Sequence, residues 1–183
     1  MAADLLEKIA PERCWEITAK ILSALMVLRG EKSVAPLMGK GEGVFAPVMG
    51  AEKWQEIHEK IFGDGGENLC LWVKETFNIP VEEINGAINV IEVASRLQQG
   101  PEQEWEYAEK TPERAICRTT RCTWMERYKD YEVDYTLIPC VRGCPAWFER
   151  AFKAINPKLN YKATKQMPRG DPYCEHIYEF KNE

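Results

Sequence analysis

The sequence lacks a long hydrophobic run and a surplus of positive charge, and its first residues do not predict a signal peptide. Its longest apolar run, ILSALMVL at residues 21–28, is far too short to span a bilayer. The net charge is −5 with Lys and Arg dispersed, so we expect neither a nucleic acid nor a membrane as a partner. The first residues carry acids early, unlike a signal peptide. These absences predict a cytoplasmic protein, whose seven cysteines are then expected to be reduced.

Signatures of nucleotide and zinc binding are missing as well. The glycine-rich segment GKGEGVFAPVMG at residues 39–50 has neither phosphate-loop spacing nor a following Lys-Ser/Thr, so it is interpreted as a connector or pocket lid. The cysteines are spaced as CxxxxC and CxxxC, whereas zinc knuckles use paired CxxC.

What is present predicts one α+β domain over residues 1–183. Hydrophobic residues make up 45% of the chain, which is enough for a core. Residues 1–100 are expected to be mainly helical, with helices within 4–30, at 51–66 ending in a glycine stop, at 67–78 and at 80–100. The last of these places Ile84, Ile88, Ile91 and Val93–Ala94 near one face.

Residues 101–183 form the cysteine-rich α+β part. The segment 104–130 is predicted to be a hairpin, followed by a helix to about Ile155 and a second hairpin around residues 168–172. An N-terminal helical layer should therefore pack on an antiparallel sheet built from two hairpins with a helix between them.

Five of the seven cysteines lie in this second part, and Cys144 is the first candidate nucleophile. Pro145 follows it, and proline favours the first helical position, so we expect Cys144 at the helix N-cap. The unpaired N–H groups there should lower the pKa of the thiol. Cys140 lies in the loop that leads to this helix. It is near enough to act as a resolving thiol for Cys144 or to bind the same metal ion. The alternative is that both thiols only pack.

The last strand supplies the other candidates. Alternation places Cys174, His176, Tyr178 and Phe180 on one face, where a thiol and an imidazole could form a catalytic row. The alternative is that His176 is a satisfied, half-buried histidine without a catalytic role.

Other side chains are candidates for binding a substrate. Arg118, Arg121 and Arg142 could each bind a carboxylate, although each alone could be a surface charge. Tyr178 is a further candidate, and Asp171 is either a substrate ligand or a turn former.

A metal site is the competing interpretation of the thiols. Its ligands would come from Cys117, Cys122, Cys140, Cys144 and Cys174, holding zinc or an iron–sulfur cluster. Cys117 and Cys122 are five residues apart, so in a regular strand they face opposite sides. Only one of them could then join Cys174 without a bulge.

The C-terminal half resembles a known family. A CxxxC-P element opening a helix, the following F…INP, and the ending GDPYCEHIYEF are similar to the L-2-amino-thiazoline-4-carboxylic acid hydrolase-like family and to the wider group of vinyl-reductase-type small-ligand-binding domains. The resemblance covers mainly residues 105–183. It implies helices on an antiparallel sheet, a cysteine-bearing pocket and hydrolytic opening of a small cyclic amidine. Cys140 or Cys144, Cys174 and Asp171 carry over by position, while Cys117 and Cys122 have no counterpart.

Three functions stay open on the sequence alone. The first is a cysteine-dependent hydrolase acting on a small C–N or C–S carboxylate substrate, with Cys144 as nucleophile and His176 as proton shuttle. The second is a metal- or cluster-holding sensor, and the third is a ligand-binding domain with structural cysteines. All three predict a small-molecule partner, and the oligomeric state, with a homodimer as one expectation, stays open.

Overall fold

A four-stranded antiparallel sheet forms one layer of the fold. The computed structural model describes residues 51–99, 102–130 and 140–181. Strands β1 (Glu104–Lys110), β2 (Arg114–Arg121), β3 (Leu159–Lys165) and β4 (Cys174–Phe180) lie in the order β1-β2-β4-β3. β1 and β2 form one hairpin, β3 and β4 form the other, and β2 pairs with β4 between them. The predicted α+β class with two hairpins is confirmed.

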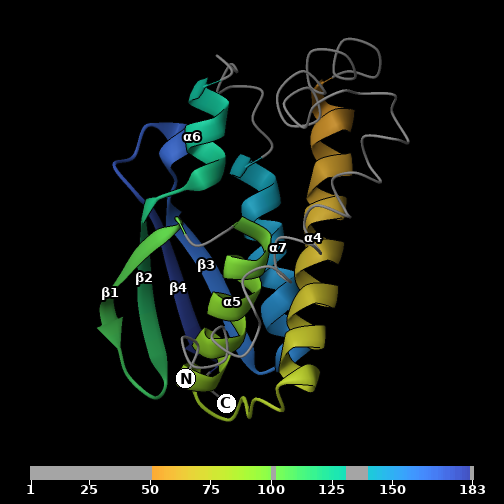
Figure 1. Ribbon diagram of the computed structural model, residues 1–183, viewed down its shortest axis with the longest axis vertical. Coiled ribbons are helices and arrows are strands. Elements are labelled where there is room, and N and C mark those ends of the chain that lie inside the picture. The colour runs from red at the N-terminus through yellow and green to blue at the C-terminus, as the bar shows by residue number, and fades with distance from the viewer. Residues whose placement is uncertain (1–50, 100–101, 131–139, 182–183) are drawn as a thin grey trace.

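Helices cover one face of this sheet. The described helices are α4 (Ala51–Thr76), α5 (Ile84–Gln99), α6 (Thr123–Asp130) and α7 (Cys140–Ile155), with a short 3-10 helix, η3 (Met167–Arg169), between β3 and β4. Figure 1 shows α5 and α7 against the sheet, with α4 on the side of α7 that faces away from it. In the ranges given above, no helix has both the length and the apolar character needed to cross a membrane. The helices predicted within 4–30 and the glycine-rich loop at 39–50 lie outside the described residues.

The core lies between α5, α7 and the sheet. Ile84, Ile88, Ile91 and Ala94 of α5 are buried, so the predicted apolar face of this helix is confirmed. Phe152 of α7 is fully buried against them, with the other apolar side chains of the same cluster. Burying one such side chain contributes about 1.5–3 kcal/mol to folding, which makes this layer the main source of stability.

The predicted glycine stop near residue 66 is wrong, because α4 continues without a break to Thr76. Gly66 faces α7 so closely that an added Cβ would overlap the carbonyl oxygen of Trp147. Gly63 faces the same helix at Arg150. These glycines therefore permit close packing of two helices and do not end the first one.

Two other predicted boundaries are also wrong. The first hairpin ends at Arg121, and the residues after it form α6, which is amphipathic and packs Met125 inward. The next helix begins at Cys140, so Pro145 lies inside it and not at its first position.

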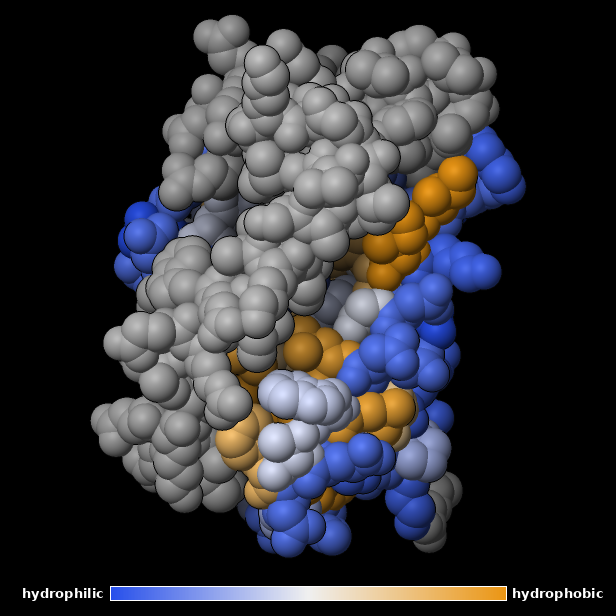
Figure 2. Space-filling view, turned by 45° about the vertical axis from the view of Figure 1, so that its right-hand side comes forward, coloured by the Kyte–Doolittle hydropathy of each residue, from blue (hydrophilic) through white to orange (hydrophobic). Residues whose placement is uncertain are grey.

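Helix α4 carries exposed apolar side chains. Among the large hydrophobic side chains of the described ranges, Ile61 and Trp72 are the exposed ones, at 59% and 45%. Figure 2 brings this side forward and shows hydrophobic surface beside the charged surface around it.

Candidate functional site

A small pocket lies between α5 and the inner face of the sheet. Its volume is about 40 Å³. The lining comes from α5, the first two strands with the residue before them, α7 and β4: Ile91, Glu92, Ser95, Gln99, Gln103, Trp105, Tyr107, Cys117, Thr119, Phe148, Cys174, His176 and Tyr178. The pocket therefore combines one carboxylate, two thiols and one imidazole in an aromatic setting.

Strand register explains why the thiols and the imidazole meet there. Cys117 lies opposite His176 in the β2–β4 pair, and Thr119 lies opposite Cys174. Directly opposed residues of antiparallel strands share a face, so all four side chains point to the same side of the sheet. The prediction that Cys174, His176 and Tyr178 share one face is confirmed, since all three line this pocket.

His176 is a buried, neutral imidazole. Its Nδ1 lies 2.9 Å from the hydroxyl of Tyr161, and Phe148 packs against both rings. Burial lowers the pKa of His176 to about 4. Because desolvation disfavours the charged form, the ring is neutral at physiological pH and can accept a proton only from a strong partner.

Glu92 is held by two aromatic donors from β1. Trp105 donates through Nε1 at 3.1 Å and Tyr107 through its hydroxyl at 2.8 Å, both to Oε1 of Glu92. Arg96, one turn along α5, stacks over the Trp105 ring at 4.2 Å. The carboxylate is therefore fixed in place by its Oε1, and its Oε2 accepts no hydrogen bond from the described residues.

The two pocket thiols are protonated at neutral pH. Burial raises the pKa of Cys117 to about 12 and that of Cys174 to about 11. The sulfur of Cys174 accepts a hydrogen bond from the backbone N–H of Met167 at 3.3 Å, which favours the thiolate and partly offsets burial. Of the two, Cys174 is therefore the more readily deprotonated.

The expected N-cap thiolate at Cys144 is wrong. Cys144 lies one turn inside α7, and it is not among the residues that line the pocket. Burial raises the pKa of its thiol well above the ordinary value, as do the neighbouring thiols of Cys140, Cys174 and Cys122. The free N–H groups of a helix terminus are no longer available at this position, so the physical basis for a lowered pKa is lost.

The cysteines gather more closely than their spacing suggested, but without a metal site. Cys122 and Cys140 pack against Met125, beside Met167. No disulfide joins any of the six cysteines that the structure describes. Over the same ranges no group of three or more His, Cys, Asp or Glu side chains is placed to hold a metal ion. The alternative with Cys117, Cys122, Cys140, Cys144 and Cys174 as ligands to zinc or an iron–sulfur cluster is therefore unsupported.

The predicted carboxylate-binding arginines lie elsewhere. Arg118 pairs with Glu175 at 2.9 Å and stacks over Tyr173, on the sheet face that does not carry the pocket. Arg142 of α7 reaches α4, where its Nη1 lies 2.7 Å from Glu52. The structure does not bring either of them to the pocket.

Asp171 lies in the turn between β3 and β4, also outside the pocket. Its Oδ2 accepts a hydrogen bond from the backbone N–H of Gln166 at 2.8 Å, which is the contact of a turn former. Tyr178 is the one predicted substrate-binding residue that lines the pocket.

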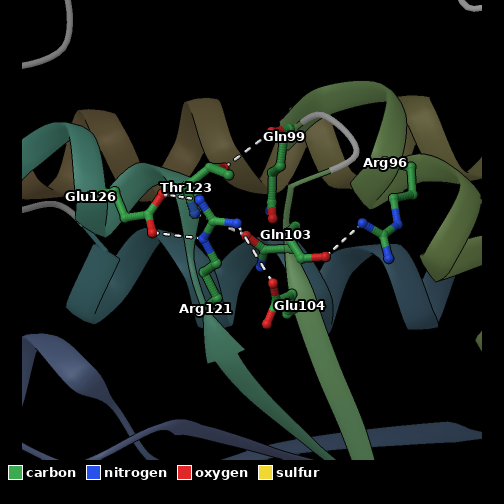
Figure 3. Close-up of polar contacts among 7 residues, drawn as sticks. All are labelled: Arg96, Gln99, Gln103, Glu104, Arg121, Thr123 and Glu126. Carbon is green, nitrogen blue, oxygen red and sulfur yellow. Dashed lines mark hydrogen bonds and ion pairs between the residues drawn. The ribbon is translucent and has the colours of Figure 1, made fainter.

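Sequence reasoning missed the polar residues at the α6 end of the pocket. Gln103 is buried, its side-chain oxygen accepts from the N–H of Thr123 at 3.1 Å, and its carbonyl accepts from Arg96. Figure 3 shows Gln99 beside this residue, with the hydroxyl of Thr123 bonded to the Gln99 carbonyl. The side-chain oxygen of Gln99 is buried and has no hydrogen-bond partner.

One signal in the sequence could have found the acidic residue. Glu92 interrupts the apolar run INVIEVA of the predicted 80–100 helix, next to Ile91 on its buried face. A carboxylate in such a position is expected to have buried donors. Its partners Trp105 and Tyr107 alternate along β1, but nothing local shows that they face α5.

Comparison with known proteins identifies the chain's relatives. Residues 44–178 match the family described as L-2-amino-thiazoline-4-carboxylic acid hydrolase. The chain belongs to this family. The match includes α4 and α5, which precede residues 105–183, the part for which the sequence analysis gave a resemblance. It also contains every residue that lines the pocket. Among curated proteins there is no match.

Two solved structures share the fold of this family member. A trafficking protein particle complex subunit 3 from Naegleria fowleri, covalently bound to palmitic acid, has a TM-score of 0.51 and 14% identity, covering 83% of this chain and 98% of that one. The phenol-responsive sensory domain of the transcription activator PoxR, with phenol, has a TM-score of 0.55 and 8% identity, covering 81% and 74%. At these identities the likeness shows the fold alone.

Proposed function

We propose that the protein binds a small organic molecule carrying N–H donors, of the amidine or amino-thiazoline type, in the pocket between α5 and the sheet. The observation that carries the proposal is the fixed carboxylate of Glu92. Trp105 and Tyr107 hold one of its oxygens, and the other is left to accept from a ligand's donors. The described lining residues include no Lys or Arg, so a group with N–H donors is a complementary ligand for Glu92. Arg96 and Lys110 lie nearby, but they stack over the Trp105 and Tyr107 rings.

The size of the pocket supports a ligand of this kind. A cavity of about 40 Å³ has room for about three water molecules, which is close to the bulk of a five-membered heterocycle. Phe148 and Tyr178 supply flat apolar walls, which favour a planar ring. The family name and the phenol held by the PoxR domain also point to small ring compounds as ligands of this fold.

Calorimetry with two matched probes tests the proposal. The compound 2-amino-thiazoline should bind the wild-type protein, whereas 2-methyl-thiazoline, which lacks the amino group, should bind much more weakly. Glu92→Gln keeps an acceptor for Trp105 and Tyr107 but removes the charge, so it should weaken binding of the amino compound by at least about tenfold.

The control is Glu82→Gln, at an exposed position before α5. It should bind the amino compound as the wild type does. Equal binding of both probes, or an unchanged affinity in Glu92→Gln, contradicts the proposal.

One observation favours hydrolysis as a second function of the same pocket. Cys174 and His176 lie side by side on the inner face of β4, and the Cys174 sulfur accepts the Met167 N–H. In this reaction the sulfur bonds to the amidine carbon while the thiol proton passes through His176 to the nitrogen that leaves. Water then cleaves the C–S bond and restores the thiol. Mass spectrometry of the protein quenched during turnover should show the adduct on Cys174, and an adduct on another residue refutes this assignment.

The predicted roles of Cys144 and Cys140 as nucleophile and partner stay predictions. Neither of them lines the pocket, whereas Cys174 does, so Cys174 is the better candidate for the attacking sulfur.

A further inference from the structure

The pocket has a second polar end that the proposed function does not use. Glu92, Ser95 and Gln99 are spaced i, i+3 and i+7 on α5, so they lie along one stripe of the helix, and all three line the pocket. Glu92 and Gln99 are about 10 Å apart along the helix axis. A ligand held at Glu92 by its N–H donors therefore directs its opposite end toward Ser95 and Gln99.

Two buried hydroxyl groups at this end are without a partner in the described part of the chain. Ser95 of α5 is 6% exposed, Thr119 of β2 is 7% exposed, and both line the pocket. Neither hydroxyl makes a hydrogen bond to another described residue. A buried hydroxyl without a partner is costly, so these two groups are suited to donate to a bound ligand.

The side-chain amide of Gln99 adds a third group of this kind. Its Oε1 is buried and makes no hydrogen bond with the described residues. The residue itself is held in place, because its backbone carbonyl accepts from Thr123 Oγ1 at 3.0 Å. A half-turn of the side-chain amide puts an N–H group where the oxygen lies. Gln99 can therefore donate to an acceptor in the pocket.

Arg96 supplies positive charge at the same end. Its guanidinium stacks over the Trp105 ring at 4.2 Å and donates to the main-chain carbonyl of Gln103, which lines the pocket beside Gln99 (Figure 3). Arg96 is not itself a lining residue, so its charge acts from behind the lining. A nearby cation lowers the cost of burying an anion.

These groups match a carboxylate. When ionised it has two oxygens that accept several hydrogen bonds and no donor of its own, and hydrogen bonds to a charged acceptor are the stronger class. A cationic group at this end would instead meet the charge of Arg96 without a carboxylate to balance it.

We propose that Ser95, Thr119 and Gln99 form a carboxylate-binding subsite. The two hydroxyls and the turned amide donate to the ligand's carboxylate, and Arg96 supplies the balancing charge. This inference rests on the proposed function, because it takes the ligand's orientation from Glu92.

Three probes that share one ring test the subsite: 2-amino-thiazoline, its 4-carboxamide and its 4-carboxylate. In calorimetry the carboxylate should bind the wild type at least about tenfold more tightly than the unsubstituted ring. The carboxamide should fall between them, because it accepts hydrogen bonds but carries no charge for Arg96 to balance. The ratio of the first two affinities is the carboxylate preference.

Substitutions at the three donors should reduce the carboxylate preference. Ser95→Ala and Thr119→Val each remove one hydroxyl and should each lower it by about threefold to tenfold. Gln99→Glu replaces the amide by a second carboxyl group and should abolish it. Thr120→Val is the matched control, because Thr120 is exposed on the opposite face of the same strand, and it should keep the preference.

The outcomes separate the two proposals. If the ring and its carboxylate bind equally well in a Glu92-dependent manner, or if the preference survives all three donor substitutions, the subsite fails and the proposed function stands. A carboxamide that binds as tightly as the carboxylate shows a subsite for neutral acceptors and also overturns the inference. If no probe binds, or if Glu92→Gln leaves all three affinities unchanged, both proposals fail.

Thermal unfolding without a ligand tests whether the Thr119 hydroxyl is free. Thr119→Val should leave the midpoint unchanged or raise it, because no protein hydrogen bond is lost. Thr123→Val should lower the midpoint, since the hydroxyl of Thr123 donates to the Gln99 carbonyl. A fall in Thr119→Val as large as that in Thr123→Val would show that the Thr119 hydroxyl is already paired, and it would overturn the inference.

Discussion

The side-chain amide of Gln166 donates a hydrogen bond to the main-chain carbonyl of Val141, 3.1 Å away. In a regular helix that carbonyl would accept from the N–H of the residue four positions later, which is Pro145. Proline has no N–H, so the buried Gln166, just after β3, supplies the donor that α7 lacks. A proline inside this helix is tolerated because of a contact 25 residues away in the chain.

Loss of this donor should destabilise the protein. Gln166→Leu leaves the Val141 carbonyl unsatisfied, and we expect the free energy of unfolding to fall by about 1–3 kcal/mol. Pro145→Ala restores the helical N–H. In the double variant the cost of Gln166→Leu should therefore be smaller than in the wild-type background. Urea unfolding of the four proteins measures this, and strict additivity would contradict the proposed exchange of donors.

Gly65 and Gly66 of α4 provide a matched pair for the helix interface. An added Cβ at Gly66 overlaps the Trp147 carbonyl, whereas at Gly65 it meets nothing within 4 Å. Gly66→Ala should push α4 away from α7 and cost about 1–3 kcal/mol. Gly65→Ala should instead stabilise by up to about 1 kcal/mol through helix propensity. Thermal unfolding distinguishes them, and equal effects would rule out close packing as the reason for Gly66.

These contacts show where prediction from sequence succeeds and where it stops. The apolar stripe of α5 and the shared face of Cys174 and His176 follow from local periodicity, which a single segment contains. The length of α4 does not, because a glycine that ends a helix and one that admits a neighbouring helix are alike in sequence. The role of Gly66 follows only from its contact with Trp147, which lies more than 80 residues later in the sequence.

The site illustrates the same limit. Prolines favour helix starts, so Cys144 was expected at an N-cap, but the donor from Gln166 allows the helix to begin at Cys140. The pocket itself needs Glu92 to meet Trp105 and Tyr107, and that pairing depends on how α5 packs on β1. No spacing within either segment contains that information.

Acid should destabilise the protein through His176. Its folded pKa of about 4 lies below the unfolded value of about 6.5, so the unfolded chain binds the proton more readily. Stability is fully present above pH 6.5 and is lost as pH falls toward 4. The loss between pH 7.5 and pH 5 should be about 2 kcal/mol.

Comparison of the two histidine variants isolates this effect. His176→Phe, which cannot titrate, should show a flatter dependence of unfolding free energy on pH. His58→Gln, on α4, shows what the second histidine of the chain contributes to the same slope. If His176→Phe and wild type lose stability in parallel over this range, the buried imidazole is not the acid-sensitive group.

Cys174 and Cys144 should separate clearly in turnover, if the pocket hydrolyses its ligand. Cys174 lines the pocket beside His176, whereas Cys144 lies inside α7 and does not line the pocket, although its thiol neighbours that of Cys174. With 2-amino-thiazoline-4-carboxylate as substrate, Cys174→Ala should abolish product formation, because no other lining thiol has a backbone donor on its sulfur. Cys144→Ala should retain most of the rate. Circular dichroism establishes that both variants are folded. If Cys144→Ala is folded but inactive while Cys174→Ala is active, the nucleophile is Cys144, as expected from the sequence.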